Sequence, residues 1–272
     1  MSVFLEKISK NICRVVINRP EKRNALNLSM IKDLRSRLEE YEENPELHVA
    51  ILAGSGGNFC AGYDLNEIVD IQTARPKVEQ IERLLWPLES RLSKHKITIA
   101  AIEGHAAGFG YELALKCDYR VADKAARMGF MNRRFGMPIM NGGTVALPKL
   151  VGLSRAMDLI GTGKAQLAHE SLQYGLLVHV ADIGCAQGKC LNLARCLAKF
   201  PQKPLLLDLC SAHSSELDRD IELMRKERER SLEYLRQCEP MDTAVAFLRG
   251  KLCRHGNFDL GNTMETIIQV TL

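Results

Sequence analysis

The sequence predicts an α/β fold, because three apolar runs of strand length alternate along the chain with helical stretches. The runs are Leu47–Leu52, Ile97–Ile102 and Tyr119–Ala122, and glycine turns follow the first two of them. Near-continuous apolar runs of this length are typical of strands that are buried on both faces. We therefore expect a sheet with covering layers on both sides.

The elements before and between these runs follow the same alternation. Residues 1–16 have the composition of strand material, and Ile12–Ile17 is rich in β-branched residues. A helix is predicted next, from apolar residues at helical spacing: Met30, Leu34, Leu38 and Tyr41. Further helices are expected over Asp64–Val69 and Tyr111–Lys116.

The C-terminal part has a different pattern. Strand signals stop beyond about Ala181, and one long amphipathic helix is predicted from the spacing of Leu217, Ile221, Met224, Leu232 and Leu235. We therefore expect an α/β core over residues 1–195 and a helical part over residues 196–272. The run Arg225–Arg230 mixes charges of both signs and is interpreted as a solvated helix face. Residues 70–96, with Pro76 and Pro87 around an amphipathic piece, are expected to form a mobile helix or lid.

The composition excludes several classes of protein. With 272 residues, 46% hydrophobic and 26% charged, the chain is neither disordered nor fibrous. A net charge of +4 is too slight to indicate nucleic-acid binding. No apolar run approaches the roughly 18 residues of a membrane span, and no presequence is recognised. We expect a cytoplasmic protein, with a trimmed mitochondrial protein as the alternative.

Motifs for several common sites are absent or incomplete. The nine cysteines include no CxxC pair, which argues against a disulfide framework and a zinc site and for reduced thiols. The sequence has no GxxxxGK[ST], HExxH or GxSxG motif. Gly108-Phe109-Gly110 begins like a dinucleotide-binding fingerprint, but Leu113 stands where its third glycine would fall. We expect no metal site.

Two segments, residues 52–65 and 102–113, share one arrangement: a buried strand, a small-residue turn, and a helix with an acid in its first turn. Helix N-termini present unpaired N–H groups, so two that converge could hold an oxygen that becomes an anion. Such an oxyanion hole, made of backbone N–H groups, would stabilise the enolate that forms from a thioester carbonyl. Glu112 could then transfer the proton that this reaction requires. An acid in a first helical turn is also favoured by the helix dipole alone.

These stretches resemble the crotonase superfamily, whose best-known type is enoyl-CoA hydratase. The resemblance rests on these motifs in order: Asn18-Arg19-Pro20, Asn24-Ala25-Leu26, Phe59 to Leu65, Gly104 to Asp118, and Phe135-Gly136 through Gly142-Gly143-Thr144 to Gly152. It implies a spiral of repeated ββα units with a helical C-terminal trimerisation part. It further implies a coenzyme A thioester as substrate without another cofactor, and a homotrimer or homohexamer. The slight net charge and the lack of an apolar run of membrane-spanning length lead us to expect neither nucleic-acid nor membrane partners.

The resemblance also implies roles for individual residues. The backbone N–H groups of Tyr63 and Phe109 would form the oxyanion hole, and the Phe109 side chain would shape the acyl pocket. Ala61 and Asp64 would flank the place where coenzyme A is gripped through backbone atoms. Its phosphates would meet Lys22 or Arg23, for which a solvated turn is the alternative. Lys251, in a weaker C-terminal resemblance over residues 244–258, is displaced by one position from a coenzyme A-binding lysine.

Hydratases of this superfamily use two glutamates, and only the first is matched, by Glu112. The second position falls at Asn132, whose amide can orient water but cannot exchange a proton. Asn141 is a further polar residue close to where other members carry an acid. The leading hypothesis is therefore an enoyl-CoA hydratase-like lyase with Glu112 as acid and base. An enoyl-CoA isomerase, other enolate chemistry or a non-catalytic acyl-CoA-binding protein are the alternatives.

Overall fold

The computed structural model describes residues 2–73, 84–87, 91–214 and 217–237, together with residues 82, 245, 248 and 249. Lys251 lies outside the described residues, and so do residues 74–81, 83 and 88–90 of the segment for which a mobile helix or lid was predicted. Within the described residues, no helix has both the length and the apolar composition needed to cross a bilayer.

A six-stranded sheet forms the centre of the fold, with the strand order β1-β2-β3-β4-β6-β9. Its first two strands are antiparallel, and all the other neighbours are parallel. The strands are β1 (Val3–Ser9), β2 (Ile12–Ile17), β3 (Val49–Gly54), β4 (Ile97–Ile102), β6 (Tyr119–Asp123) and β9 (His179–Ala181). The three apolar runs of the sequence are thus the neighbouring strands β3, β4 and β6.

A second, smaller sheet has the order β5-β7-β8, formed by β5 (His105–Ala107), β7 (Arg127–Gly129) and β8 (Gln166–Leu167). Two strands of the first sheet lead directly into a strand of the second: β4 continues into β5 and then α4, and β6 continues into β7 and then the 3-10 turn over Met131–Phe135. A parallel bridge between Cys60 and Ala106 extends the small sheet by one more segment. This repetition of ββα units confirms the predicted spiral.

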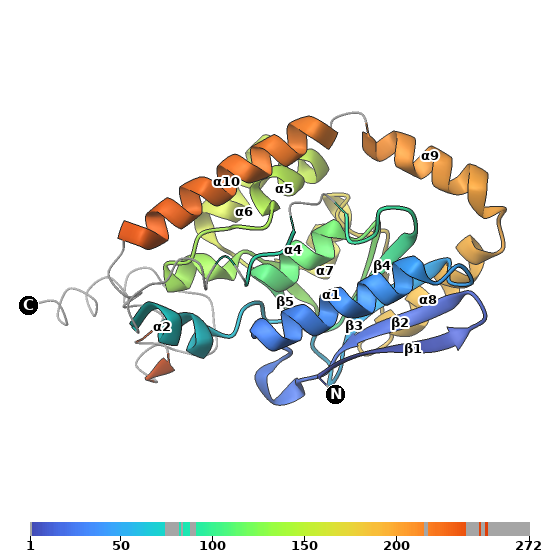
Figure 1. Ribbon diagram of the computed structural model, residues 1–272, viewed down its shortest axis with the longest axis horizontal. Coiled ribbons are helices and arrows are strands. Elements are labelled where there is room, and N and C mark those ends of the chain that lie inside the picture. The colour runs from blue at the N-terminus through green and yellow to red at the C-terminus, as the bar shows by residue number, and fades with distance from the viewer. Residues whose placement is uncertain are drawn as a thin grey trace, which may run out of the picture.

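Helices cover the sheets and form the C-terminal part. They are α1 (Leu28–Glu43), α2 (Leu65–Thr73), α4 (Phe109–Lys116), α5 (Gly143–Val151), α6 (Leu153–Thr162), α7 (Ala168–Gln173), α8 (Ala186–Ala198), α9 (Gln202–Ser214) and α10 (Leu217–Gln237), with short 3-10 turns over Pro20–Lys22 and Met131–Phe135. The last described strand ends at Ala181, as predicted. In Figure 1, α10 lies along α5, which it contacts. The predicted boundary at residue 195 falls inside α8 and stays a prediction.

The hydrophobic core has two main parts, one on each face of the large sheet. Alternate residues of β3 and β4, such as Ile51 and Ile99, pack against Cys190 and Ala194 of α8. The residues between them, such as Leu52 and Ala100, belong to the larger cluster on the other face. This alternation follows from the two-residue period of a strand and confirms that these strands are buried on both faces.

Candidate active site

The two glycine turns are joined to each other through main-chain atoms. The Cys60 N–H donates to the His105 carbonyl and the Ala107 N–H donates to the Cys60 carbonyl, both at 2.9 Å. A methyl group on Gly110 would lie 2.2 Å from the Cys60 carbonyl oxygen, so only glycine permits this approach. Gly62 adopts φ +96°, a backbone conformation that favours glycine. The segments that the sequence singled out therefore converge.

Tyr63 and Phe109 each follow the bridged residues by three positions, and they lie side by side. Their rings stack with centroids 4.5 Å apart and an angle of 13° between the planes. A methyl group on Gly62 would lie 3.2 Å from the Phe109 nitrogen, which places that nitrogen beside the other turn. Phe109 opens α4, so its N–H has no acceptor inside the helix. Among the described residues, neither N–H donates a hydrogen bond.

Aromatic side chains cover this point. The Trp86 ring lies 6.2 Å from the Phe109 ring, and the Tyr63 hydroxyl donates to the Leu84 carbonyl at 3.3 Å. All three aromatic side chains are buried. No motif pointed to Trp86, which contacts the site from a segment between two undescribed stretches. That Phe109 shapes an acyl pocket stays a prediction.

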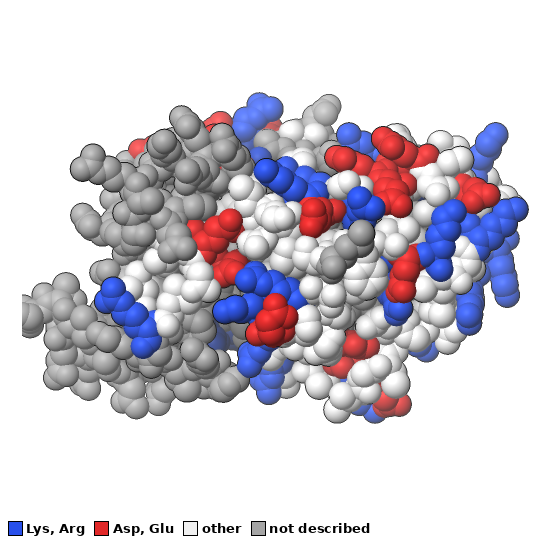
Figure 2. Space-filling model, turned by 60° about the horizontal axis from the view of Figure 1, so that its bottom comes forward, with Lys and Arg blue, Asp and Glu red and all other residues white. Residues whose placement is uncertain are grey.

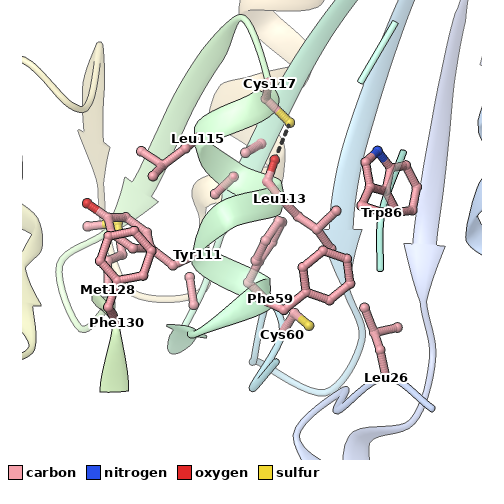
Figure 3. Close-up of a cluster of buried hydrophobic side chains, with 14 of the residues drawn as sticks. Leu26, Phe59, Cys60, Trp86, Tyr111, Leu113, Leu115, Cys117, Met128 and Phe130 are labelled. Atoms are coloured by element: carbon pink, nitrogen blue, oxygen red, sulfur yellow. Dashed lines mark hydrogen bonds between the residues drawn. The ribbon is translucent and has the colours of Figure 1, made fainter. Parts of the chain in front are cut away.

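Helix α4 is buried on all sides. Figure 3 shows Tyr111 directed toward Met128 and Phe130 on one side of the helix, with Phe59 and Trp86 on the other. An all-round apolar helix is typical of a core, so a charged residue on it needs partners. Glu112 is only 3% exposed on this helix.

The partners of Glu112 come from the N-terminus of α5. Its Oε1 accepts from the Asn141 N–H at 2.8 Å and from the Gly143 N–H at 3.1 Å. Its Oε2 accepts from Asn141 Nδ2 at 3.1 Å, and the same Nδ2 donates to the Tyr63 hydroxyl at 2.9 Å. The Asn141 Oδ1 in turn accepts from the backbone N–H of Trp86 at 2.8 Å. Asn141 thus links Glu112 to the aromatic cover.

The protonation of Glu112 is shifted by its surroundings. Burial, and then the nearby carboxylate of Glu227, raise its pKa to about 7, against the lowering effect of the hydrogen bonds from Asn141 and Gly143. A carboxyl group with a pKa near neutrality can both accept and deliver a proton at physiological pH. This is a property that acid–base chemistry requires.

Asn132 lies beside the turn that begins α4. A methyl group on Gly108 would lie 3.5 Å from its Cβ and 3.9 Å from its Oδ1. The Nδ2 donates to the carbonyls of Met137 and Pro138, both at 3.0 Å, which fixes the orientation of the amide. The buried Oδ1 has no hydrogen-bond partner among the described residues. An acceptor without a donor is therefore placed next to the two turns.

The residues expected to bind coenzyme A cluster on one side of this arrangement. Lys22 and Arg23 are exposed, and the Arg23 carbonyl accepts from the Ala61 N–H at 3.0 Å. Asp64 is buried, and although burial alone would raise its pKa, hydrogen bonds from Asn66 and Arg19 lower it. Its side chain therefore fixes the turn, and its backbone is also engaged: the Asp64 N–H donates to the Leu26 carbonyl at 2.9 Å, and the Asp64 carbonyl accepts from the Ile68 N–H at 3.2 Å. These binding roles stay predictions.

One interpretation of the charged run in α10 is wrong in part. Glu227 is 8% exposed, and its side chain does not belong to a solvated face. Its Oε2 accepts from the Gly142 N–H at 2.5 Å, and its Oε1 accepts from the N–H and hydroxyl of Thr144 at 2.9 and 2.6 Å. The period that places Met224 in the core places Glu227, three residues later, on the same helix face. The three-residue spacing from Met224 was therefore the feature of the sequence that could have predicted the burial of Glu227.

On the face shown in Figure 2, the described residues form no large field of one charge. Figure 2 shows acidic and basic side chains interspersed over most of the described part of one face, with several basic ones toward the right-hand end. Across the described ranges, no three His, Cys, Asp or Glu residues are grouped as a metal site would require.

Comparison with known proteins gives a consistent result. The family model for enoyl-CoA hydratase/isomerase matches residues 7–243. The 1,2-epoxyphenylacetyl-CoA isomerase of Escherichia coli (strain K12) is 33% identical over 83% of this chain and 88% of its own. The short-chain-enoyl-CoA hydratase of Clostridium acetobutylicum is 36% identical over 66% of this chain and 69% of its own. The crystal structure of an enoyl-CoA hydratase from Mycobacterium tuberculosis H37Rv superposes with a TM-score of 0.74, covering 86% of this chain and 97% of that one at 26% identity.

Proposed function

The chain belongs to the enoyl-CoA hydratase/isomerase family and is an enzyme of that type, and from this premise we propose that it hydrates 2-enoyl-CoA thioesters with Glu112 as its acid and base. The observation that carries the proposal is the buried Glu112 carboxyl, one helical turn from the Phe109 N–H at which the two glycine turns converge.

In the proposed reaction, the thioester oxygen accepts hydrogen bonds from the N–H groups of Tyr63 and Phe109. A water molecule held by the Asn132 Oδ1 attacks C3 and gives a proton to the Glu112 carboxylate, while the double-bond electrons move onto the thioester oxygen. The resulting enolate collapses as Glu112 returns the proton to C2. One water is added in total, and the carbonyl is the electron sink, so the scheme uses no cofactor beyond coenzyme A itself.

Isomerisation is the second candidate, and the amide at Asn132 favours it. No second carboxyl group is available at that position to donate a proton. Glu112 alone would remove a proton from C2 of a 3-enoyl-CoA thioester and return it to C4, which leaves a 2-enoyl thioester. Its pKa of about 7 supports both halves of this transfer.

We further propose that the coenzyme A moiety lies along Ala61 and the Asp64 backbone, with its phosphates near Lys22 and Arg23. The exposure of both cations and the contact between Arg23 and Ala61 support this placement. Substitution of both cations by Ala should raise KM several-fold with little change in kcat, because the lost contacts are made equally in substrate and transition state.

Assembly and compartment complete the proposal. We propose a homotrimer or homohexamer, to be checked by light scattering. We propose a cytoplasmic location, and the relative named enoyl-CoA hydratase domain-containing protein 2, mitochondrial, of Homo sapiens supports the mitochondrial alternative.

The deciding experiment compares turnover of 2-enoyl-CoA and 3-enoyl-CoA panels by wild type, Glu112→Gln and Asn132→Ala. We expect Glu112→Gln to lose about 100-fold or more of kcat for each active substrate. Asn132→Ala should lower hydration more than isomerisation, because only hydration needs an oriented water. Glu229→Gln, an exposed substitution on α10, is the matched control and should keep the wild-type rate.

Each outcome separates the candidates. Turnover of 3-enoyl thioesters without hydration assigns isomerisation. Binding of thioesters without turnover of either panel contradicts the proposal and identifies a non-catalytic binding protein. Full activity of Glu112→Gln would remove Glu112 from the mechanism.

A further inference from the structure

The N-terminus of α5 binds two carboxylates. The four consecutive N–H groups of residues 141–144 alternate between them. Those of Asn141 and Gly143 donate to Glu112, and those of Gly142 and Thr144 donate to Glu227. The first N–H groups of a helix lack acceptors inside it and carry partial positive charge, so this is a favourable place for anions. It is unusual for one terminus to take two buried acids.

The two acids come from different parts of the chain. Glu112 lies on α4 in the α/β core, and Glu227 lies on α10 in the C-terminal helical part. Both are less than 10% exposed, at 3% and 8%. Two carboxyl groups that bind neighbouring N–H donors and are shielded from water repel each other when both are ionised, so the doubly ionised state is disfavoured.

Other contacts hold α10 in place over this terminus. The Arg228 guanidinium donates to the carbonyls of Trp86 and Met140, and the Ser231 hydroxyl donates to the Ile139 carbonyl at 2.9 Å. A cavity of about 30 Å³ separates the helices here, lined by Glu112 and Lys116 of α4 and by Asp220 and Met224 of α10. The position of Glu227 is therefore fixed by the hydrogen bonds of neighbouring α10 residues as well as by its own.

We infer that Glu227 is a positioning residue that, by occupying alternate donors of the α5 N-terminus, sets a second negative charge beside Glu112 and so controls the uptake and release of the Glu112 proton. This inference rests on the proposed function for the use of that proton. Glu227 does not touch the two glycine turns, and it acts only through Glu112.

The other charged and titratable groups around Glu112 are of both signs. Lys116 lies one turn further along α4, and Asp220 and Arg228 face the site from α10. Tyr63 reaches it through Asn141, and Arg35 of α1 lies over the Trp86 ring. Burial is the largest cause of the raised pKa of Glu112, and Glu227 is the next.

The test is Glu227→Gln, which keeps the shape and an acceptor oxygen and removes the charge. We expect the pKa of Glu112 to fall by about 1, measured by carbon NMR of labelled glutamate carboxyls and assigned through Glu112→Gln. The acid limb of kcat/KM against pH should fall by the same amount. Glu227→Asp restores a charge and should move both values back, whereas Glu229→Gln should leave both at the wild-type values.

A folded Glu227→Gln protein with an unmoved Glu112 titration would overturn the inference and leave Glu227 as a structural cap. The NMR titration decides this even if no thioester is turned over, whereas absence of turnover counts against the proposed function alone. If Glu227→Gln does not fold, an NMR titration of the wild-type protein still tests the inference. The Glu227 carboxyl signal, assigned through Glu227→Asp, must then show an inflection at the pH where Glu112 titrates, and its absence contradicts the inference.

Discussion

The N-termini of α4 and α5 differ in what their N–H groups meet. At α4, the Phe109 N–H has no acceptor among the described residues, and the Tyr63 N–H beside it has none either. At α5, four consecutive N–H groups all donate to carboxylates of the protein. The acid in the first turn of α4 does not cap its own helix but crosses to α5. At one terminus two N–H groups are thus without an acceptor among the described residues, and at the other all four have one.

The two helix N-termini share one physical preference, for negative charge, but differ in whether the protein itself supplies that charge. Both termini attract negative charge. The donors of α5 fix the Glu112 carboxyl group and its surroundings, whereas in the proposed reaction the donors of α4 would serve an oxygen that gains charge. The predictions below test each terminus in turn.

The largest effect is expected at the N-terminus of α4. In Gly110→Ala, the new methyl group would meet the Cys60 carbonyl, so the two turns must separate. Misplacement of the donors should lower kcat/KM by about 100-fold or more, as measured with the most active thioester. Gly161→Ala on α6, where nothing lies within 4 Å of the added methyl, is the control and should leave kcat/KM unchanged. Equal activity of both variants would contradict the described convergence.

The next effect concerns the N-terminus of α5 and pH. The pKa of Glu112 is raised from 4.5 to about 7, so the folded protein holds a proton that the unfolded chain releases between these values. Stability from this group is therefore present below pH 4.5 and is lost as the pH rises to about 7. Relative to Glu112→Gln, the wild-type free energy of unfolding should fall by about 3 kcal/mol across this range. Urea titrations at several pH values measure it, and parallel pH profiles would contradict it.

The smallest effect sharpens the description of the N-terminus of α5. Thr144→Val removes the hydroxyl that donates to the Glu227 carboxylate at 2.6 Å. A lost hydrogen bond to a buried charged group should cost about 2 kcal/mol. Thr162→Val on α6, where an exposed hydroxyl donates to the Asp158 carbonyl, should cost under about 0.5 kcal/mol in the same chemical denaturation assay. Equal losses in the two variants would show that Glu227 is not held as described.

The sequence predicted the parts of the fold that have a strong local pattern. The run Ile97–Ile102 coincides with β4, because a strand buried on both faces is apolar throughout. The small sheet was not predicted from sequence patterns, because strands of two or three residues such as Gln166–Leu167 are too short to show a periodicity. Its existence follows instead from the family resemblance.

The candidate site was predicted to a similar degree. Glu112 and Asn141 were named from motifs, and the structure joins them by hydrogen bonds. Glu227 was missed because its partners lie some 85 positions away in the chain, and its neighbours Lys226 and Arg228 make the run look solvated. Long-range contacts of this kind leave only a helical period in the sequence.

The link between Cys60 and Ala106 is made entirely of main-chain atoms, while the side chains of Tyr63 and Phe109 point into the aromatic cover. The backbone position of both residues is therefore set by the topology and not by their side chains. The two side chains differ, because the Tyr63 hydroxyl is tied through Asn141 to Glu112, whereas the Phe109 ring is held by its contacts with other rings. A substitution at Phe109 would therefore reshape the aromatic cover without removing a hydrogen bond from the group of side chains around Glu112.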